Sequence, residues 1–307
     1  MAHAAFNEKV AALWVGVEQG LFRKHGVEVQ LLYIRTGPQT IAAMASGEIQ
    51  IAYTIPSGVL SAAAGGMDLA MFGGIVNKAE GDFIVSPSIR TAEELKGKKV
   101  GVQSIGGGIW SQTMLALEYF GIEPARDKLN VMVIGGDQST IAQALATGTI
   151  DAAYLGYAFS SQLKTKGFRV LLDLGKAPIP YQGLALISRL SYLKQNPAIA
   201  DSVLRGILDA VAFVQTPAKK EAVLKSLMKN LRLSDPREAE SGYNALQWLY
   251  SLDITPDTKG IRNMQRLLAV TNPKVKAVRT EDVVDEDPVR RVRQSVFYRE
   301  LLEKSKK

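Results

Sequence analysis

Two stretches of this sequence, about 100 residues apart, repeat one pattern that constrains the fold more than any other feature. Each begins with an apolar run, at 29–34 and at 131–134, and continues through a glycine-containing loop into a short Ala-rich segment that stops at a glycine. A second short apolar run then ends in a tyrosine, Tyr53 or Tyr154. This order predicts a strand, a crossover helix and a parallel second strand. Ala-rich helices that stop at glycine can look alike by chance, but the loop, helix length, glycine and tyrosine all recur, so we predict two similar α/β lobes.

The composition sets limits on function. The 307 residues include no cysteine, which excludes disulfides, thiolate nucleophiles and cysteine-ligated metals and suits an exported protein. The net charge is +7, with much of the basic excess near the C-terminus. A nucleic-acid surface is one interpretation of that excess, but no nucleic-acid motif accompanies it, so we favour a solvated helix face and expect no nucleic-acid partner. We also find no metal-ligand spacing, predict no cofactor, and see no stretch approaching the roughly 20 apolar residues that cross a bilayer.

The two ends of the chain differ in character. The first five residues run almost directly into an apparent ligand loop and helix, where we would expect a strand first. We therefore expect a processed or trimmed start, without a signal peptide and without that strand. Apolar periodicity predicts helices over 198–215, 218–230, 235–251 and 257–270, followed by a basic final helix. Strand-like segments near 84–88 and 182–187 are expected to cross between the lobes, as a two-segment hinge requires.

An ordered set of motifs resembles one family. The run 13–29 (LWVGVEQGLFRKHGVEV) resembles the opening of solute-binding proteins of bacterial ABC importers. Further matches follow in the same order at 44–49, 95–102, 145–152 and 192–197. The group most similar to this chain includes the binders of nitrate, taurine, alkanesulfonates and thiamin pyrimidines.

The resemblance implies a type II periplasmic-binding-protein fold. Two mixed, mostly parallel sheets with flanking helices would be joined by a two-strand hinge, and the C-terminal part would be helical. The first lobe would comprise 1–86 and 186–307, and the second 87–185. The resemblance further implies a periplasmic or extracytoplasmic monomer that closes over a small solute and docks on the membrane permease of an ABC transporter.

The candidate site follows from a rule for open α/β sheets, in which ligands lie beyond the carboxyl ends of the strands. The rule selects the loops that follow the predicted strands, including 103–110, and the resemblance points to the same loops. The predicted ligand-binding residues are Asn7, Lys9, Gly37, Pro38, Gln39, Thr54, Ile55, Pro56, Ser57, Asn77, Ser104, Gly106, Gly107, Gly108, Trp110, Gly135, Tyr157 and Tyr181. Several of these loops lead into helix N-termini, which favour an anion. We interpret Asp137 as an N-cap, because its carboxylate would repel such a ligand.

The residue types in these loops indicate an organic acid. Trp110, Tyr53, Tyr154, Tyr157 and Tyr181 either line the cleft, where they would contact an apolar or aromatic body, or pack in the core. The nearest cations are Lys9, Arg35 and Lys78, and none lies in the loops of the second lobe. An inorganic oxyanion such as nitrate is therefore less attractive than a small organic acid held by helix ends, for which an aromatic carboxylate or sulfonate is one candidate. A non-acidic metabolite remains an alternative cargo.

An enzyme is the second alternative. A related fungal pyrimidine synthase shares the implied fold and uses a histidine and a cysteine-rich loop. Here the histidines are His3, near the start of the chain, and His25, in a turn far from the strand ends. There is no G-x-S-x-G nucleophile elbow. We therefore predict a binding protein and no catalytic residues.

Overall fold

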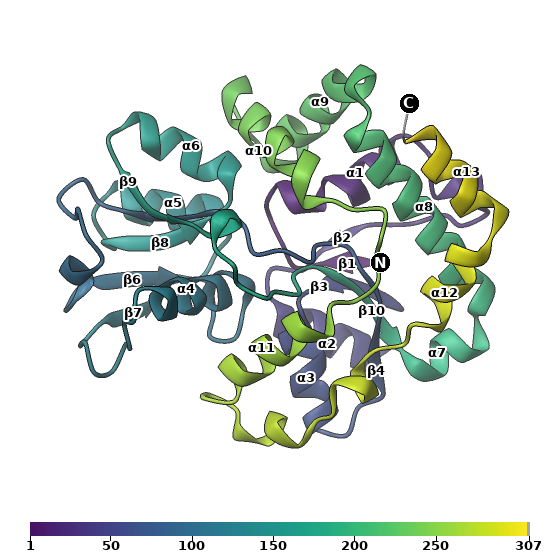
Figure 1. Cartoon of the computed structure of the whole chain (residues 1–307), viewed down its shortest axis with the longest axis horizontal. Helices are drawn as coiled ribbons and strands as arrows, with labels where there is room; N and C mark the ends of the chain where they lie inside the picture. The colour runs from purple at the N-terminus through teal and green to yellow at the C-terminus, as the bar shows by residue number, and fades with distance from the viewer. Residues whose placement is uncertain (306–307) are drawn as a thin grey trace.

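Two α/β lobes lie side by side in the computed structural model, which describes residues 1–305 (Figure 1). The sheet of the first lobe has the strand order β2-β1-β3-β10-β4, and that of the second has β7-β6-β8-β5-β9. In the first sheet the strands are β1 (Ala2–His3), β2 (Leu32–Tyr33), β3 (Ile51–Thr54), β4 (Leu69–Gly74) and β10 (Ala185–Arg189). In the second they are β5 (Asp82–Val85), β6 (Lys99–Val102), β7 (Asn130–Val133), β8 (Ala152–Leu155) and β9 (Arg169–Asp173). The predicted two-lobe α/β fold is confirmed.

The repeated sequence pattern forms equivalent units in the two lobes. Helix α2 (Gly37–Ala45) joins β2 to β3, and α5 (Gln138–Ala146) joins β7 to β8. In each unit the two strands are parallel, as predicted, and a third parallel strand, β1 or β6, lies between them. The antiparallel strand of each sheet, β10 or β5, occupies the next position along. The two lobes therefore share one topology.

The start of the chain corrects one expectation. A first strand is present: β1 pairs with β2 on one side and β3 on the other. It has only two paired residues, too few for strand periodicity to reveal it. Strand β2 is equally short, because only Leu32 and Tyr33 have partners on β1. Most of the apolar run 27–34 is therefore not a strand.

The crossings between the lobes differ from those expected near 84–88 and 182–187. Strand β5 pairs with β8 and β9 in the second sheet, and β10 pairs with β3 and β4 in the first. The chain therefore crosses at 75–81 and 174–184. The Gly183 amide donates to the Val76 carbonyl (2.7 Å), and Lys78 and Pro180 form an antiparallel bridge, so the crossings run together. An apolar run does not by itself distinguish a crossing segment from the buried strand that follows it.

The predicted helical C-terminal part is confirmed, and it packs mainly on the first lobe (Figure 1). The remaining helices are α1 (Ala11–Glu18), α3 (Pro56–Ala64), α4 (Gly108–Tyr119), α6 (Tyr157–Thr165), α7 (Leu190–Gln195), α8 (Pro197–Gln215), α9 (Lys220–Leu231), α10 (Pro236–Leu249), α11 (Thr258–Leu268), α12 (Asp287–Gln294) and α13 (Val296–Lys304). Two of the C-terminal helices reach the second lobe, where α10 contacts α6 and α11 contacts α4. Among residues 1–305, no helix combines the length and apolar character needed to cross a membrane.

Gly260 allows α11 to pack directly on the second crossing. A Cβ at this position would lie 2.2 Å from the Gln182 nitrogen and 2.3 Å from the Tyr181 carbonyl carbon. Gly260→Ala should displace the helix, because the backbone atoms of the crossing cannot rotate away from the added methyl group. The free energy of unfolding should fall by about 1–3 kcal/mol. Urea unfolding measures this loss. Gly37→Ala is the matched control, since its Cβ would meet Thr54 Oγ1 at 3.8 Å and should change stability little; equal losses in the two variants would contradict the packing argument.

Candidate functional site

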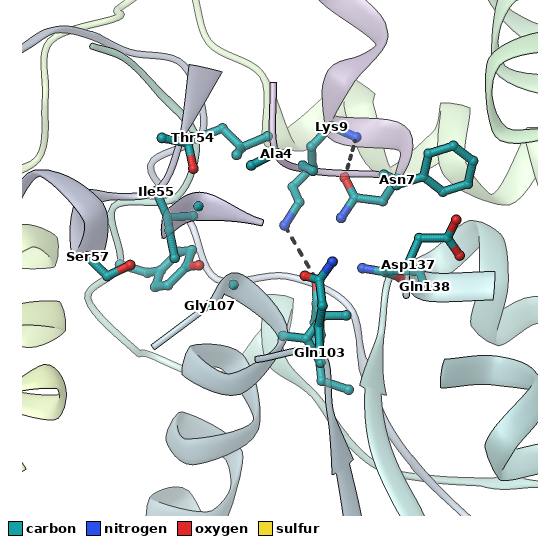
Figure 2. A pocket seen from close by; sticks show the side chains of 18 residues that line it. Ala4, Asn7, Lys9, Thr54, Ile55, Ser57, Gln103, Gly107, Asp137 and Gln138 are labelled. Carbon is teal, nitrogen blue, oxygen red and sulfur yellow. Dashed lines mark hydrogen bonds between the residues drawn. The ribbon is translucent and has the colours of Figure 1, made fainter. Parts of the chain in front are cut away.

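A cavity of about 50 Å³ lies between the lobes, beyond the carboxyl ends of the parallel strands (Figure 2). On this measure one water needs roughly 10–15 Å³, so the cavity holds a group of only a few heavy atoms. Its walls come from both lobes: Ala4, Ala5, Phe6, Asn7, Lys9, Gly37, Thr54, Ile55, Ser57, Gln103, Gly107, Gly108, Ile109, Asp137, Gln138, Tyr154, Tyr181 and Leu184.

The structure brings half of the predicted site residues to this cavity. The residues that line it are Asn7, Lys9, Gly37, Thr54, Ile55, Ser57, Gly107, Gly108 and Tyr181. Those outside its walls are Pro38, Gln39, Pro56, Asn77, Ser104, Gly106, Trp110, Gly135 and Tyr157. The strand-end rule thus selects loops that border this cavity but does not tell which side chains of a loop face inward.

Several of the outlying residues have other contacts. Pro38 and Gln39 are exposed on α2, and Pro56 occupies the first turn of α3. The Asn77 amide donates to the Thr255 carbonyl (2.8 Å), and the Tyr157 hydroxyl donates to Asp173 Oδ1 (2.5 Å). Trp110 is buried in the hydrophobic core.

The glycine loops before α4 and α5 account for three further outlying residues, Ser104, Gly106 and Gly135. A Cβ at Gly107 would lie 2.6 Å from Ser104 Oγ, so the loop is tight and the serine hydroxyl stays buried behind it. The Gly106 carbonyl accepts a hydrogen bond from the Ser57 hydroxyl across the cleft (2.7 Å). In the equivalent loop before α5, Gly135 turns the chain with φ 73°.

Other cavity residues were not predicted. Ala4, Ala5 and Phe6 follow the unrecognised strand β1. Ile109 lies in the selected loop 103–110 but was not singled out, and Leu184 and Gln138 lie outside the selected residues. Asp137 is an N-cap as predicted, with Oδ1 accepting from the Ser139 (2.9 Å) and Thr140 (3.2 Å) amides, and it also lines the cavity. The position directly after such a cap, at the end of a parallel strand, is the signal that could have found Gln138.

Backbone partners fix the orientation of three amide side chains at the cavity. Asn7 Oδ1 accepts from the Lys9 amide (3.2 Å), and Gln138 Oε1 accepts from the Gly156 amide (2.7 Å). Because a backbone N–H only donates, both NH₂ groups point the other way, toward the cavity (Figure 2). Gln103 is reversed: its NH₂ donates to the Arg35 (2.8 Å) and Gly136 (2.6 Å) carbonyls, leaving its oxygen as an acceptor. Two donors and one acceptor are thus fixed.

Two hydroxyls add to the donors. Thr54 and Tyr181 are only 2% and 1% exposed and line the cavity. Neither hydroxyl is hydrogen-bonded to another of the described residues. Burial, and then the charge of Glu80, raises the pKa of Tyr181, so the phenol keeps its proton. Both groups can donate to a ligand.

Two helix N-termini face the cavity from opposite lobes without a side-chain cap. Helix α3 begins after Ile55 and α4 after Gly107, and residues of both first turns line the cavity. By contrast, Thr36 caps α2 and Asp137 caps α5. Free N–H groups at a helix N-terminus and the helix dipole both favour negative charge. The cavity therefore suits a ligand rich in acceptor atoms.

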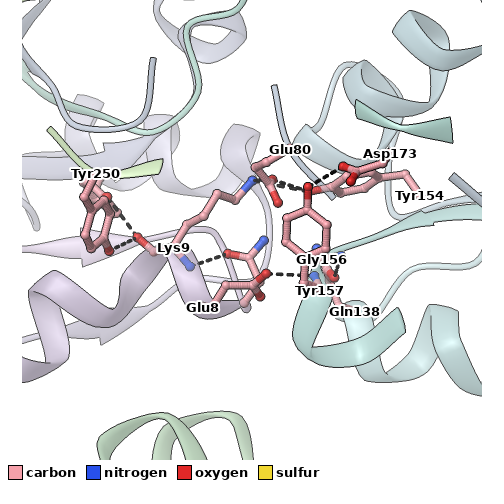
Figure 3. Close-up of polar contacts among 11 residues, drawn as sticks. Glu8, Lys9, Glu80, Gln138, Tyr154, Gly156, Tyr157, Asp173 and Tyr250 are labelled. Atoms are coloured by element: carbon pink, nitrogen blue, oxygen red, sulfur yellow. Dashed lines mark hydrogen bonds and ion pairs between the residues drawn. The ribbon is translucent and has the colours of Figure 1, made fainter. Parts of the chain in front are cut away.

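Lys9, the lysine that lines the cavity among residues 1–305, is already paired (Figure 3). The Lys9 ammonium contacts Glu80 of the first crossing, which also accepts from the Tyr154 hydroxyl. Lys9 Nζ lies 3.4 Å from the same hydroxyl. The Lys9 carbonyl accepts from Tyr53 (3.0 Å) and Tyr250 (2.9 Å), which holds the backbone in place. Lys9 thus neutralises Glu80 and contributes little net charge to the cavity.

Glu8, beside it, joins the two lobes. Its Oε1 accepts from the Tyr157 amide (2.8 Å), so a carboxylate of the first lobe caps helix α6 of the second (Figure 3). Oε2 of Glu8 is buried without a partner among residues 1–305. Burial, and then the charge of Glu80, raises the pKa of Glu8 to about 7. With the Ser57–Gly106 and Gln103–Arg35 bonds, this contact holds the lobes closed over the cavity.

Residues 7–220 match the family described as NMT1/THI5 like. The chain belongs to this family. A Brucella abortus protein named as a binding protein is 28% identical over 234 residues, covering 74% of this chain and 70% of its own length. The predicted resemblance to ABC-importer solute-binding proteins is therefore confirmed.

Solved structures share the fold. The periplasmic aliphatic sulphonate-binding protein SsuA of Escherichia coli superposes with a TM-score of 0.73 at 21% identity, over 92% of both chains. The periplasmic nitrate-binding protein NrtA of Synechocystis PCC 6803 gives 0.74 at 16% identity, over 96% of this chain and 88% of its own. Both comparisons show that the two-lobe fold is shared over nearly the whole chain.

Proposed function

We propose that this protein is an extracytoplasmic solute-binding protein that captures a small organic acid, a carboxylate or sulfonate, between its lobes. The observation that carries the proposal is the convergence of donors on one cavity between the lobes: two oriented amides, two hydroxyls and two uncapped helix N-termini. The chain would act as a monomer that delivers its cargo to an ABC-importer permease. No nucleic acid or cofactor takes part in this function.

The charge balance argues for a weakly charged acid. Lys9 is paired with Glu80, and Asp137 is occupied as a helix cap. A ligand with several negative charges would meet no unpaired side-chain cation among the described cavity residues. A monoanion held by dipoles and neutral donors fits this balance. The sulphonate and nitrate named for SsuA and NrtA are also monoanions.

We propose binding rather than catalysis for the same cavity. Asp137 accepts hydrogen bonds as a helix cap, and Lys9 is paired with Glu80. The tyrosines keep their protons, since burial raises the pKa of both Tyr154 and Tyr181. A general base near neutral pH requires a free group of suitable pKa within reach of the substrate. The cavity lining provides none among residues 1–305.

A thermal-shift screen tests the cargo class. The protein is unfolded and refolded to remove carried-over solute, then heated with alkanesulfonates, aromatic acids, nitrate, amino acids, pyrimidines and sugars. A ligand present at about 100 times its Kd should add roughly 2.7 kcal/mol of stability. We expect shifts with sulfonates or carboxylates. A shift only with neutral sugars or cationic solutes would contradict the proposal.

Thr54→Val probes the cavity donors separately from the fold. The hydroxyl has no partner among the described residues, so its removal should leave stability unchanged while weakening binding of the acid roughly 10-fold. Isothermal titration with a ligand from the screen measures the affinity. Thr40→Val is the matched control: Thr40 is buried outside the cavity and donates to the Thr36 carbonyl (3.0 Å), so stability should fall and affinity should hold. Equal affinity in the Thr54 variant and the wild type would remove this hydroxyl from the site.

A further inference from the structure

Phe6 forms a wall shared by the cavity and a much larger groove on the surface. The residue lies in the loop between β1 and the short turn Glu8–Val10, half-buried, and its side chain lines both spaces. The groove, of about 930 Å³, runs along the β1–β2 edge beside α1 and the end of α9. We call it the aromatic groove, after His3, Trp14 and Tyr33, which line it together with Phe6.

Aromatic contacts hold Phe6 between the two lobes. Its ring centroid lies 5.5 Å from Tyr33 in the first lobe and 6.2 Å from Phe159 on α6 of the second. Beyond Tyr33 the chain of rings continues through His3 (5.4 Å) to Trp14 (5.9 Å). Burial lowers the pKa of His3, whose Nδ1 pairs with the Ala5 carbonyl, so this ring is neutral at physiological pH. A row of uncharged aromatic rings thus begins directly behind the cavity wall.

The two spaces suit different parts of an elongated acid. The cavity presents donors and free helix ends but has room for only a few heavy atoms. The part of the aromatic groove beside Phe6 offers the rings of His3, Trp14 and Tyr33, which favour a hydrocarbon or aryl chain. Its far side is polar, lined by Glu18, Glu28, Lys229, Asn230 and Arg232. Phe6 is the side chain that lines both and so separates them.

We infer that Phe6 sets the size of the cargo: its ring confines the ligand to compact acids and bars longer tails from the aromatic groove. This inference rests on the proposed function and adds to it the residue that selects the length of the acid. Removing the ring should join the cavity to the groove. A longer tail could then lie against Tyr33 and His3 while its acid group keeps the same donors.

Titration calorimetry with straight-chain alkanesulfonates, from methanesulfonate to octanesulfonate, tests the inference. In the wild type we expect affinity to stop rising once the chain fills the cavity. In Phe6→Ala it should keep rising, by about fourfold per added methylene that enters the groove. In Phe6→Leu, which keeps an apolar side chain, affinity should stop rising at a chain length between those of the wild type and Phe6→Ala. Phe159→Ala is the control, because it removes a ring that contacts Phe6 but does not line the cavity. Its affinity should stop rising at the same chain length as in the wild type.

The outcomes separate the two claims. If the wild type binds short sulfonates and Phe6→Ala shows the same length limit, the role of Phe6 is wrong and the proposed function stands. If the wild type binds no acid in this series or in the thermal-shift screen, the proposed function fails. A crystal structure of ligand-free Phe6→Ala decides the point without any ligand: one continuous space from Thr54 to Tyr33 supports the inference, and collapse of Tyr33 or Phe159 into the gap overturns it.

Discussion

Replacing Lys9 with methionine should lower the free energy of unfolding by about 3–5 kcal/mol, because it leaves buried carboxylates without their cation. Glu80 is fully buried and the Lys9 side chain only 7% exposed, so neither charge is compensated by water. Methionine retains most of the apolar stem of lysine and removes the charge, which separates electrostatics from packing. Urea unfolding at about pH 8, where carboxylates ionise most readily, should show the full loss.

Lys24→Met is the matched control for this prediction. Lys24 pairs with Asp209 at 2.7 Å, but its side chain is 59% exposed, so loss of that pair should cost less than about 1 kcal/mol. At acidic pH the deficit of the Lys9 variant should shrink, since Glu8, whose pKa is raised by burial, can then take up a proton. If Lys9→Met lowers the free energy of unfolding no more than Lys24→Met does, the charges of Lys9 and Glu80 are not shielded from water as the structure indicates.

Glu8→Gln should abolish a pH dependence of stability that the wild type shows. The pKa of Glu8 is about 7 in the folded protein, against a reference of 4.5. Between these values the folded state binds more protons than the unfolded one, so the wild type should lose stability as pH rises and level off above about 7. The loss is up to about 3 kcal/mol. Glutamine can still accept the hydrogen bond from the Tyr157 amide but carries no charge. The variant should therefore be more stable than the wild type in mildly alkaline buffer.

The control for this experiment is Glu48→Gln, at an exposed position near the end of α2. It should show the wild-type slope in urea unfolding across the same range. Persistence of that slope in Glu8→Gln would assign it to another group. A slope of the opposite sign in the wild type, with stability rising toward neutral pH, would exclude a raised pKa of Glu8 as the main cause of the pH dependence.

Local patterns in the sequence sufficed for much of the fold. The paired stretches around Tyr53 and Tyr154 predicted two equivalent units, and glycines stop the helix of each, Gly47 with φ 82° and Gly148 with φ 74°. The C-terminal helices followed from apolar periodicity. Strand β1 could not be found this way, because its two residues have no period and are defined only by their partners on β2 and β3.

The chemistry of the site was harder to predict than its position. The strand-end rule located Asn7 and Thr54 at the cavity, and Tyr181 was selected as an aromatic side chain. The direction of the Asn7 amide, however, depends on a backbone bond within its own turn. The neutralisation of Lys9 depends on Glu80, which lies 71 residues away along the chain. Trp110 has the residue type expected of a cleft wall and is buried in the core instead, because side-chain direction on α4 depends on tertiary packing.

Small-angle X-ray scattering of the refolded protein, with and without a saturating acid from the thermal-shift screen, tests the central claim most directly. The bonds from Glu8 to Tyr157, Ser57 to Gly106 and Gln103 to Arg35 link the lobes only when they are closed. Capture of a solute between the lobes therefore predicts that the radius of gyration falls when the acid binds. An unchanged radius at full saturation would contradict binding by lobe closure and would place the acid elsewhere on the molecule.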